Sequence, residues 1–167
     1  SGNPMPNNVN LWGFSYNPVT EMVYASSRYS ALGTFVWVFT RAQLEASVAN
    51  GTCIAPLIKP GPNPTLNVGD PFTPNAPGDM LGVVGDNAGN IYVVKNVFNG
   101  GTSTYILKYN PAGQYIASSP ADYVLGSGGY YYAMGLIYSE TNNRLYLSNY
   151  TDEPTEDCIS AFDASTM

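Results

Sequence analysis

Short apolar runs alternate with polar turns along most of this chain, and the pattern is typical of β-strands rather than of helices. In GDNAGNIYVV (85–94) a polar turn leads directly into a short strand of β-branched and aromatic residues. The segments NPVTE (17–21) and ETNNR (140–144) have the same turn chemistry, because Asn, Pro, Asp and Gly preset or tolerate the backbone angles of tight turns. Each of these turns therefore predicts a hairpin of two strands.

The hairpin pattern occurs three times, over residues 10–42, 79–113 and 132–166. Each copy has a glycine early in its first strand, then a tyrosine in its second strand and an aromatic residue in its third. These landmarks are Gly13, Tyr24 and Phe39, then Gly82, Tyr92 and Tyr109, then Gly135, Tyr146 and Phe162. The distances between successive landmarks agree among the copies to within two positions. The spacing predicts three copies of one three-stranded antiparallel unit.

The strands of the three units can be placed from the alternation of apolar and polar residues. They are predicted over 11–16, 22–27 and 34–41, over 80–85, 91–96 and 104–110, and over 134–139, 144–149 and 158–164. Residues 114–119 fit a fourth, outer strand of the second unit. Between the first two units, residues 42–51 predict a short helix, 53–59 a strand and 60–78 a proline-rich loop, in which regular ladder pairing is excluded.

Repeated antiparallel units that open with a small-residue strand are typical of β-propeller blades. The stretch DNAGNIYVV resembles the inner hairpin of NHL-type propellers, and YNPVTEMVYASS and YSETNNRLYLSN resemble the same hairpin in YVTN-type surface-protein propellers. The resemblance implies an all-β fold of three β-propeller-like blades, each a four-stranded antiparallel sheet, in a single domain over 1–167. Blade 1 is expected at about 10–60, a proline-rich insert at about 60–78, blade 2 at about 79–120 and blade 3 at about 130–167. The alternative is a β-sandwich or an open stack of β-meanders.

Three blades are too few for a closed propeller, which uses 4–8. Three arrangements satisfy the pattern: two copies that form one six-bladed ring, a complex with a second chain, or a piece of a longer propeller. A homo-oligomer, or missing blades from the same protein, is therefore the expected partner. An exposed sheet face at either end would otherwise present apolar surface that soluble monomers rarely tolerate.

Composition narrows the class of protein further. The net charge is −6 and only 11% of the residues are charged, so the chain lacks the basic patch that nucleic-acid binding requires. No apolar run approaches the length of a membrane helix, so no membrane span is expected. The low charge and the 14 tyrosines favour an extracellular or cell-surface location.

Catalytic signatures are absent from the sequence. The chain has no histidine, which excludes a Ser-His-Asp triad and His-ligated zinc, and its two cysteines lack partners for nucleophilic catalysis. No catalytic residue is assigned and no cofactor is expected, with calcium as the one candidate ion. Its candidate ligands are the carboxylates of one loop, although their spacing does not match an EF-hand and a solvated hairpin loop explains them equally: Asp152, Glu153, Glu156 and Asp157.

A propeller binds ligands where the loops that enter its first strands and join its second to its third strands meet. Aromatic, amide and carboxylate side chains in such loops suit a glycan or a protein ligand. The candidates are Trp12, Arg28, Tyr29, Asp79, Asn99, Tyr131 and Tyr132. The expected function is a non-enzymatic module for recognition or assembly. The alternatives are a fragment of a propeller enzyme, a hydrolase or lyase that uses carboxylates, and a purely structural self-assembling protein.

Two further features bear on the extracellular expectation. Cys53 and Cys158 are either a disulfide, within the chain or between chains, or two separate thiols. Asn50 and Asn149 lie in Asn-X-Thr sequons and would accept glycans in a eukaryotic secretory pathway, although an Asn- and Thr-rich chain also contains such triplets by chance.

Overall fold

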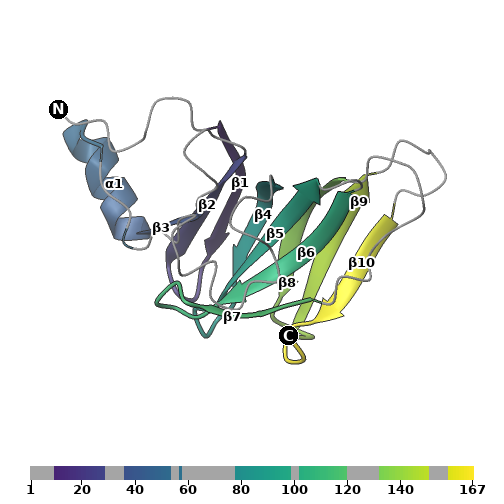
Figure 1. The fold of residues 1–167 in the computed structure, drawn as a ribbon. Coiled ribbons are helices and arrows are strands. Elements are labelled where there is room, and N and C mark those ends of the chain that lie inside the picture. The colour runs from purple at the N-terminus through teal and green to yellow at the C-terminus, as the bar shows by residue number, and fades with distance from the viewer. Residues whose placement is uncertain are drawn as a thin grey trace.

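The computed structural model describes residues 10–28, 36–53, 57, 78–98, 102–119, 132–150 and 158–167, with the backbone alone at several strand ends. These residues form three antiparallel sheets and one helix (Figure 1). The all-β expectation and the antiparallel pairing are confirmed, but of the expected four-stranded sheets the described residues form four strands in one sheet and three in each of the other two. None of the three sheets closes on itself.

Each sheet is a meander, because consecutive strands pair with one another in chain order. Sheet 1 contains β1 (Asn10–Asn17), β2 (Met22–Arg28) and β3 (Val36–Thr40), and sheet 2 contains β4 (Gly78–Gly85), β5 (Ile91–Phe98), β6 (Thr102–Tyr109) and β7 (Tyr115–Ser118). Sheet 3 contains β8 (Tyr132–Ser139), β9 (Arg144–Tyr150) and β10 (Cys158–Asp163). The predicted strands of the three copies, and the outer strand at 114–119, are confirmed to within a few residues.

The predicted short helix is also present, as α1 (Arg41–Asn50) directly after β3. A capping box begins it: the Thr40 hydroxyl accepts from the Gln43 N–H at 3.1 Å, and the Gln43 side chain accepts from the Thr40 N–H at 2.9 Å. Gly51, with φ +61°, ends it in the left-handed conformation. Most of the strand predicted over 53–59 lies outside the described residues, but the Leu57 N–H donates to the Val38 carbonyl at 2.8 Å, so Leu57 lies beside the edge of β3.

The hairpin turns that open each sheet have the predicted turn chemistry. The Asn17 side chain accepts from the N–H groups of Val19 and Thr20 at 2.8 and 3.1 Å and so organises the β1–β2 turn. Glu21 and Asn143, each directly before a second strand, have φ of +53° and +52°. These local bonds explain why the hairpins form where the sequence predicts them.

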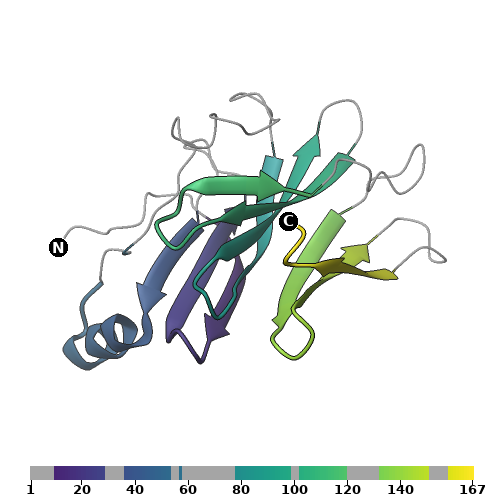
Figure 2. The same ribbon diagram turned by 90° about the horizontal axis from the view of Figure 1, so that it is seen from below.

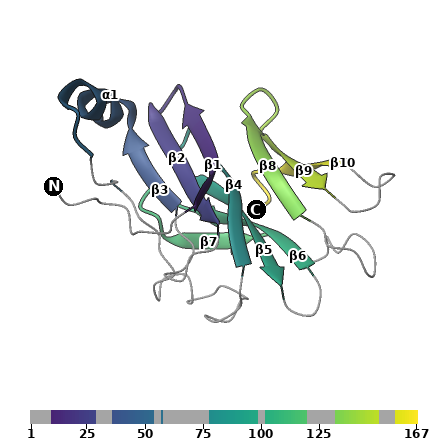
Figure 3. The same cartoon turned by 90° about the horizontal axis from the view of Figure 1, so that it is seen from above.

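The first strands of the three sheets, β1, β4 and β8, lie next to one another, and most of the contact between sheets runs through them (Figures 1 and 3). Sheet 1 and α1 lie at one end of the row and sheet 3 at the other, with sheet 2 between them (Figure 2). We call the face of each sheet that carries its landmark glycine and second-strand tyrosine the forward face, and the opposite one the backward face. In the described part of the chain, two sheet faces have no neighbouring sheet: the backward face of sheet 1 and the forward face of sheet 3.

The forward face of each sheet packs on the backward face of the next. Tyr24, Val36 and Val38 of sheet 1 form one core with Val83, Ile91, Val93, Leu107 and Tyr109 of sheet 2. Val84, Tyr92, Val94 and Ile106 of sheet 2 form a second core with Leu136, Leu145 and Leu147 of sheet 3. Because side chains alternate between faces along a strand, the same alternation supplies both cores. The repeat in the sequence is therefore also a repeat in packing.

The landmark glycines allow the close approach of neighbouring first strands. Each lies at or beside a register shift of the first strand, between Leu11 and Gly13, Met80 and Val83, and Ala133 and Gly135. A Cβ on Gly13 would overlap the Leu81 carbonyl, and one on Gly82 would lie 2.8 Å from the backbone N of Leu136. Among the described residues, a Cβ on Gly135 would meet only Ser148 of its own sheet. Two of the three glycines thus serve contacts between sheets.

Candidate functional site

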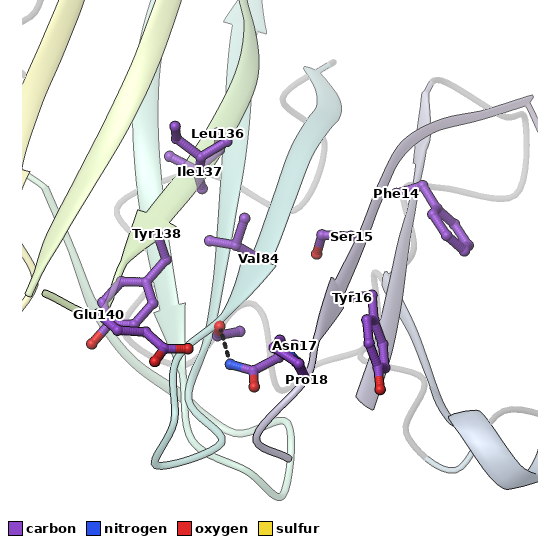
Figure 4. Close-up of a pocket in the computed structure, with 11 residues that line it drawn as sticks. Phe14, Ser15, Tyr16, Asn17, Pro18, Val84, Leu136, Ile137, Tyr138 and Glu140 are labelled. Atoms are coloured by element: carbon purple, nitrogen blue, oxygen red, sulfur yellow. Dashed lines mark hydrogen bonds between the residues drawn. The ribbon is translucent and has the colours of Figure 1, made fainter. Parts of the chain in front are cut away.

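A pocket of about 230 Å³ lies where β1 and β8 separate over the end of β4 (Figure 4). It is lined by Phe14, Ser15, Tyr16, Asn17, Pro18, Val84, Gly85, Leu136, Ile137, Tyr138 and Glu140. Figure 4 shows Ser15 directed towards Val84 and Phe14 directed away from it. The pocket therefore belongs to the centre of the row, where the first strands of all three sheets meet.

The polar groups of this pocket are mostly engaged in the fold. The Asn17 amide donates to the Gly85 carbonyl at 2.9 Å, and the Tyr138 hydroxyl donates to the Asn143 side chain at 2.9 Å. The Ser15 hydroxyl oxygen is buried and has no hydrogen-bond partner among the described residues. Sites for small molecules usually span about 300–1,000 Å³, so this pocket is below their lower limit. It has room for a small polar molecule only.

None of the described residues that line the pocket is a predicted ligand-binding residue. Trp12, 47% exposed, stands near the start of β1, whereas the pocket lies at the end of that strand. Arg28, Asp79 and Tyr132 are described by their backbone only, within β2, β4 and β8. Tyr29, Asn99 and Tyr131 lie outside the described residues. The sequence pointed to one end of the first strands, and the pocket occupies the other, beside the Asn17 and Glu140 turns.

The predicted calcium ligands Asp152, Glu153, Glu156 and Asp157 all lie outside the described residues. Within the described ranges, no group of three or more acidic, cysteine or histidine side chains could hold a metal ion.

A helix long and apolar enough to span a membrane is likewise not found in that part of the chain.

Cys53 is exposed and forms no disulfide in the described part of the chain, while Cys158 at the start of β10 is described by its backbone only. Asn50 is exposed at the end of α1, so its sequon is open to solvent. Asn149 lies within β9, again described by its backbone.

Asp86 is the one acidic side chain that is buried in the described part of the chain. Its carboxylate accepts from the N–H groups of Ala88 and Asn90 at 2.9 and 2.8 Å, from the Asn90 amide at 2.8 Å and from the Tyr92 hydroxyl at 3.1 Å. All four donors belong to the β4–β5 hairpin. The carboxylate is thus fully engaged in shaping its own turn, and this is a structural role rather than a catalytic one.

Burial raises the pKa of the Tyr92 hydroxyl far above its ordinary value of 10.0, and the negative charge of Asp86 raises it further. Burial also raises the pKa of Tyr24. Both tyrosines lie in the cores between sheets. The folded chain therefore holds these phenolic protons more tightly than the unfolded chain does.

We expect the free energy of unfolding to fall as the pH rises above about 10, because unfolded tyrosines then lose protons that folded Tyr24 and Tyr92 retain. Below that pH both states are protonated and this contribution is fully present. Urea unfolding at about pH 8 and about pH 11 measures the change, and Tyr92→Phe should show a smaller drop. Equal drops in the two proteins would contradict the assignment to Tyr92.

Four of the nine large apolar side chains that the described part of the chain exposes lie on the two open sheet faces. Phe14 and Tyr16, on the backward face of sheet 1, are 72% and 43% exposed. Ile137 and Ile159, on the forward face of sheet 3, are 64% and 74% exposed. Their counterparts in the interior of the row, such as Val83 and Ile106, are 2% and 1% exposed. The two end faces, rather than the pocket, therefore expose apolar side chains whose counterparts inside the row are buried.

Neither face was singled out residue by residue from the sequence, although the periodicity contains the signal. Ile137 and Ile159 occupy the positions of Val84 and Ile106 in the preceding copy, counted from the landmark glycine and third-strand aromatic. Part of the backward face of sheet 1 is covered, since Trp37 and Phe39 are buried and Leu44 of α1 packs on them. The exposed part is the first strand, β1.

No protein-family model and no curated protein matches this chain.

Proposed function

We propose that this protein is a non-enzymatic assembly module of the β-propeller type, which acts by docking its open sheet faces against further sheets. The single observation that carries the proposal is the exposure of Phe14, Ile137 and Ile159 on faces whose counterparts inside the row are buried.

The energetic argument is one of scale. Burying an exposed isoleucine or phenylalanine side chain contributes about 1.5–3 kcal/mol. Three such side chains on two faces therefore represent a driving force of several kcal/mol for a partner that covers them. Clustered exposed apolar side chains of this kind are typical of protein interaction sites. The pocket offers less, because it is small and the Asn17 and Tyr138 side chains that line it bond within the fold.

The test is a charge placed on one face. Ile159→Glu should abolish any self-association of the chain, since a carboxylate would have to be buried without a partner in the docked state. Val48→Glu is the matched control, because Val48 is 84% exposed and belongs to α1 rather than to β1 or to sheet 3. Sedimentation velocity at micromolar concentration measures the mass of each protein. The proposal fails if the unsubstituted protein sediments as a single chain or if Val48→Glu dissociates it equally.

A further inference from the structure

Sheet 3 retains the landmark glycine with which sheets 1 and 2 contact their successors, and it also retains the serine that takes part in this contact in sheet 1. In sheet 1 the Ser26 hydroxyl accepts from the Gly13 N–H at 3.1 Å and donates to the Leu81 carbonyl of sheet 2. In sheet 3 the Ser148 hydroxyl accepts from the Gly135 N–H at 2.9 Å in the same way. Gly135 and Ser148 are both exposed. The glycine–serine pair is therefore present without the following sheet that it contacts in sheet 1.

The apolar side chains of sheet 3 complete this docking face. Ile137 and Ile159 project from the same face as Gly135 and Ser148, as their pairing across β8, β9 and β10 requires. In sheet 2 the side chains at these two positions, Val84 and Ile106, are buried against β8 and β9. The forward face of sheet 3 is thus shaped to receive the first strand of another such sheet.

The backward face of β1 is the counterpart that the chain itself offers. β1 has its register shift at the same place as β4, whose shift faces Gly13. Phe14 occupies the position of Val83 and Leu136, which are 2% and 6% exposed in the interior contacts. Phe14 itself is 72% exposed. β1 therefore repeats the surface that β4 and β8 present to the sheet before them.

Resting on the proposed function, we infer that the partner is a second copy of this chain, docked head to tail. β8 of one copy packs on β1 of the other, and the reverse contact closes the pair into a ring of six sheets. An interface of two unlike faces forms a ring when its rotation closes. Closed propellers contain 4–8 sheets, so two copies supply a permitted number, whereas one supplies three and three supply nine.

The repeat, and not the apolar character of the open faces alone, indicates that the partner is a second copy of this chain. The contact between copies is the third instance of a contact made twice within the chain, between β1 and β4 and between β4 and β8. An unrelated protein would have to reproduce both the register shift and the glycine-permitted approach. A second copy already has them.

The experiment uses two variants that each block one face. Ile137→Glu blocks the forward face and Phe14→Glu blocks the backward face; both side chains are exposed, so the fold should tolerate the changes. Each variant alone should sediment as a monomer, because every head-to-tail contact needs one intact face of each kind. The two mixed in equal amounts should form a two-chain species, because one unlike pair of intact faces remains. Val19→Glu, 60% exposed in the β1–β2 turn, is the control and should self-associate as the unsubstituted chain does.

The outcomes separate this inference from the proposed function. If Phe14→Glu alone still forms dimers that Ile159→Glu dissociates, like faces pair with like, and only the head-to-tail inference is overturned. A mixture that remains monomeric also overturns it, as does a mass above two chains for the unsubstituted protein, which would indicate an open filament. An unsubstituted chain that is monomeric throughout overturns both.

Discussion

Gly13→Ala should lower the free energy of unfolding by about 1–3 kcal/mol, the usual cost of forcing an extra methyl group into a packed interior. The added Cβ would overlap the Leu81 carbonyl and the Ser26 hydroxyl. A backbone carbonyl cannot rotate away, so β1 and β4 would have to separate. The reduced flexibility of the unfolded chain offsets only about 0.4–1 kcal/mol of this loss. Urea unfolding of the two proteins gives the difference.

The repeat provides a matched control for this substitution. Gly135→Ala is the same change at the equivalent position of sheet 3, where the added Cβ meets only the Ser148 side chain, with its hydroxyl at 2.7 Å. A side-chain hydroxyl can rotate, so at protein concentrations low enough for the chain to be a monomer we expect a loss well below that of Gly13→Ala. Equal losses at both positions would show that the glycines serve their own strands rather than the approach of neighbouring sheets.

Asp86→Ala should cost about 2–4 kcal/mol, because hydrogen bonds to a charged group contribute about 1.5–3 kcal/mol and several are lost together without simple additivity. The substitution leaves the Tyr92 hydroxyl in the core without its acceptor, along with the donors of the β4–β5 turn. Chemical unfolding monitored by tyrosine fluorescence and by circular dichroism measures the loss.

Asp163 is the comparison for this carboxylate. It accepts from the Ser165 N–H at 2.9 Å in an exposed turn after β10, so Asp163→Ala removes a similar local bond without leaving a buried group unpaired. We expect its effect to be much smaller. If the two substitutions destabilise equally, burial of the Asp86 cluster does not contribute to stability as argued.

Much of the fold was predictable because its signals are local. Asn17 and Asp86 bond to the backbone of their own turns, and strand alternation is visible within a few residues, so hairpins and their order follow from the sequence. The helix was equally predictable, since Thr40 and Gln43, which form its N-terminal cap, are only three residues apart in the sequence. The position of β7 followed from the same alternation.

The functional surfaces were harder to predict from the sequence, because they depend on which sheet has a neighbour. Tyr24 and Tyr146 are equivalent in the repeat, yet Tyr24 is 1% exposed in a core and Tyr146 lies on an open face. Alternation assigns both to the same face but does not say whether another sheet covers it. The pocket was missed for a related reason. Ser15 of β1 and Tyr138 of β8 line it because these two strands separate over β4, and no local sequence pattern predicts that separation. The propeller resemblance stays a prediction, and so do the ligand and calcium sites.

The most direct test of the account is the mass of the unsubstituted protein in solution, measured by sedimentation equilibrium over a dilution series. If three sheets with uncovered end faces need further sheets, the mass should approach that of two chains at high concentration and fall towards that of a single chain on dilution. The mass of a single chain at every concentration, from a folded and soluble protein, would contradict it.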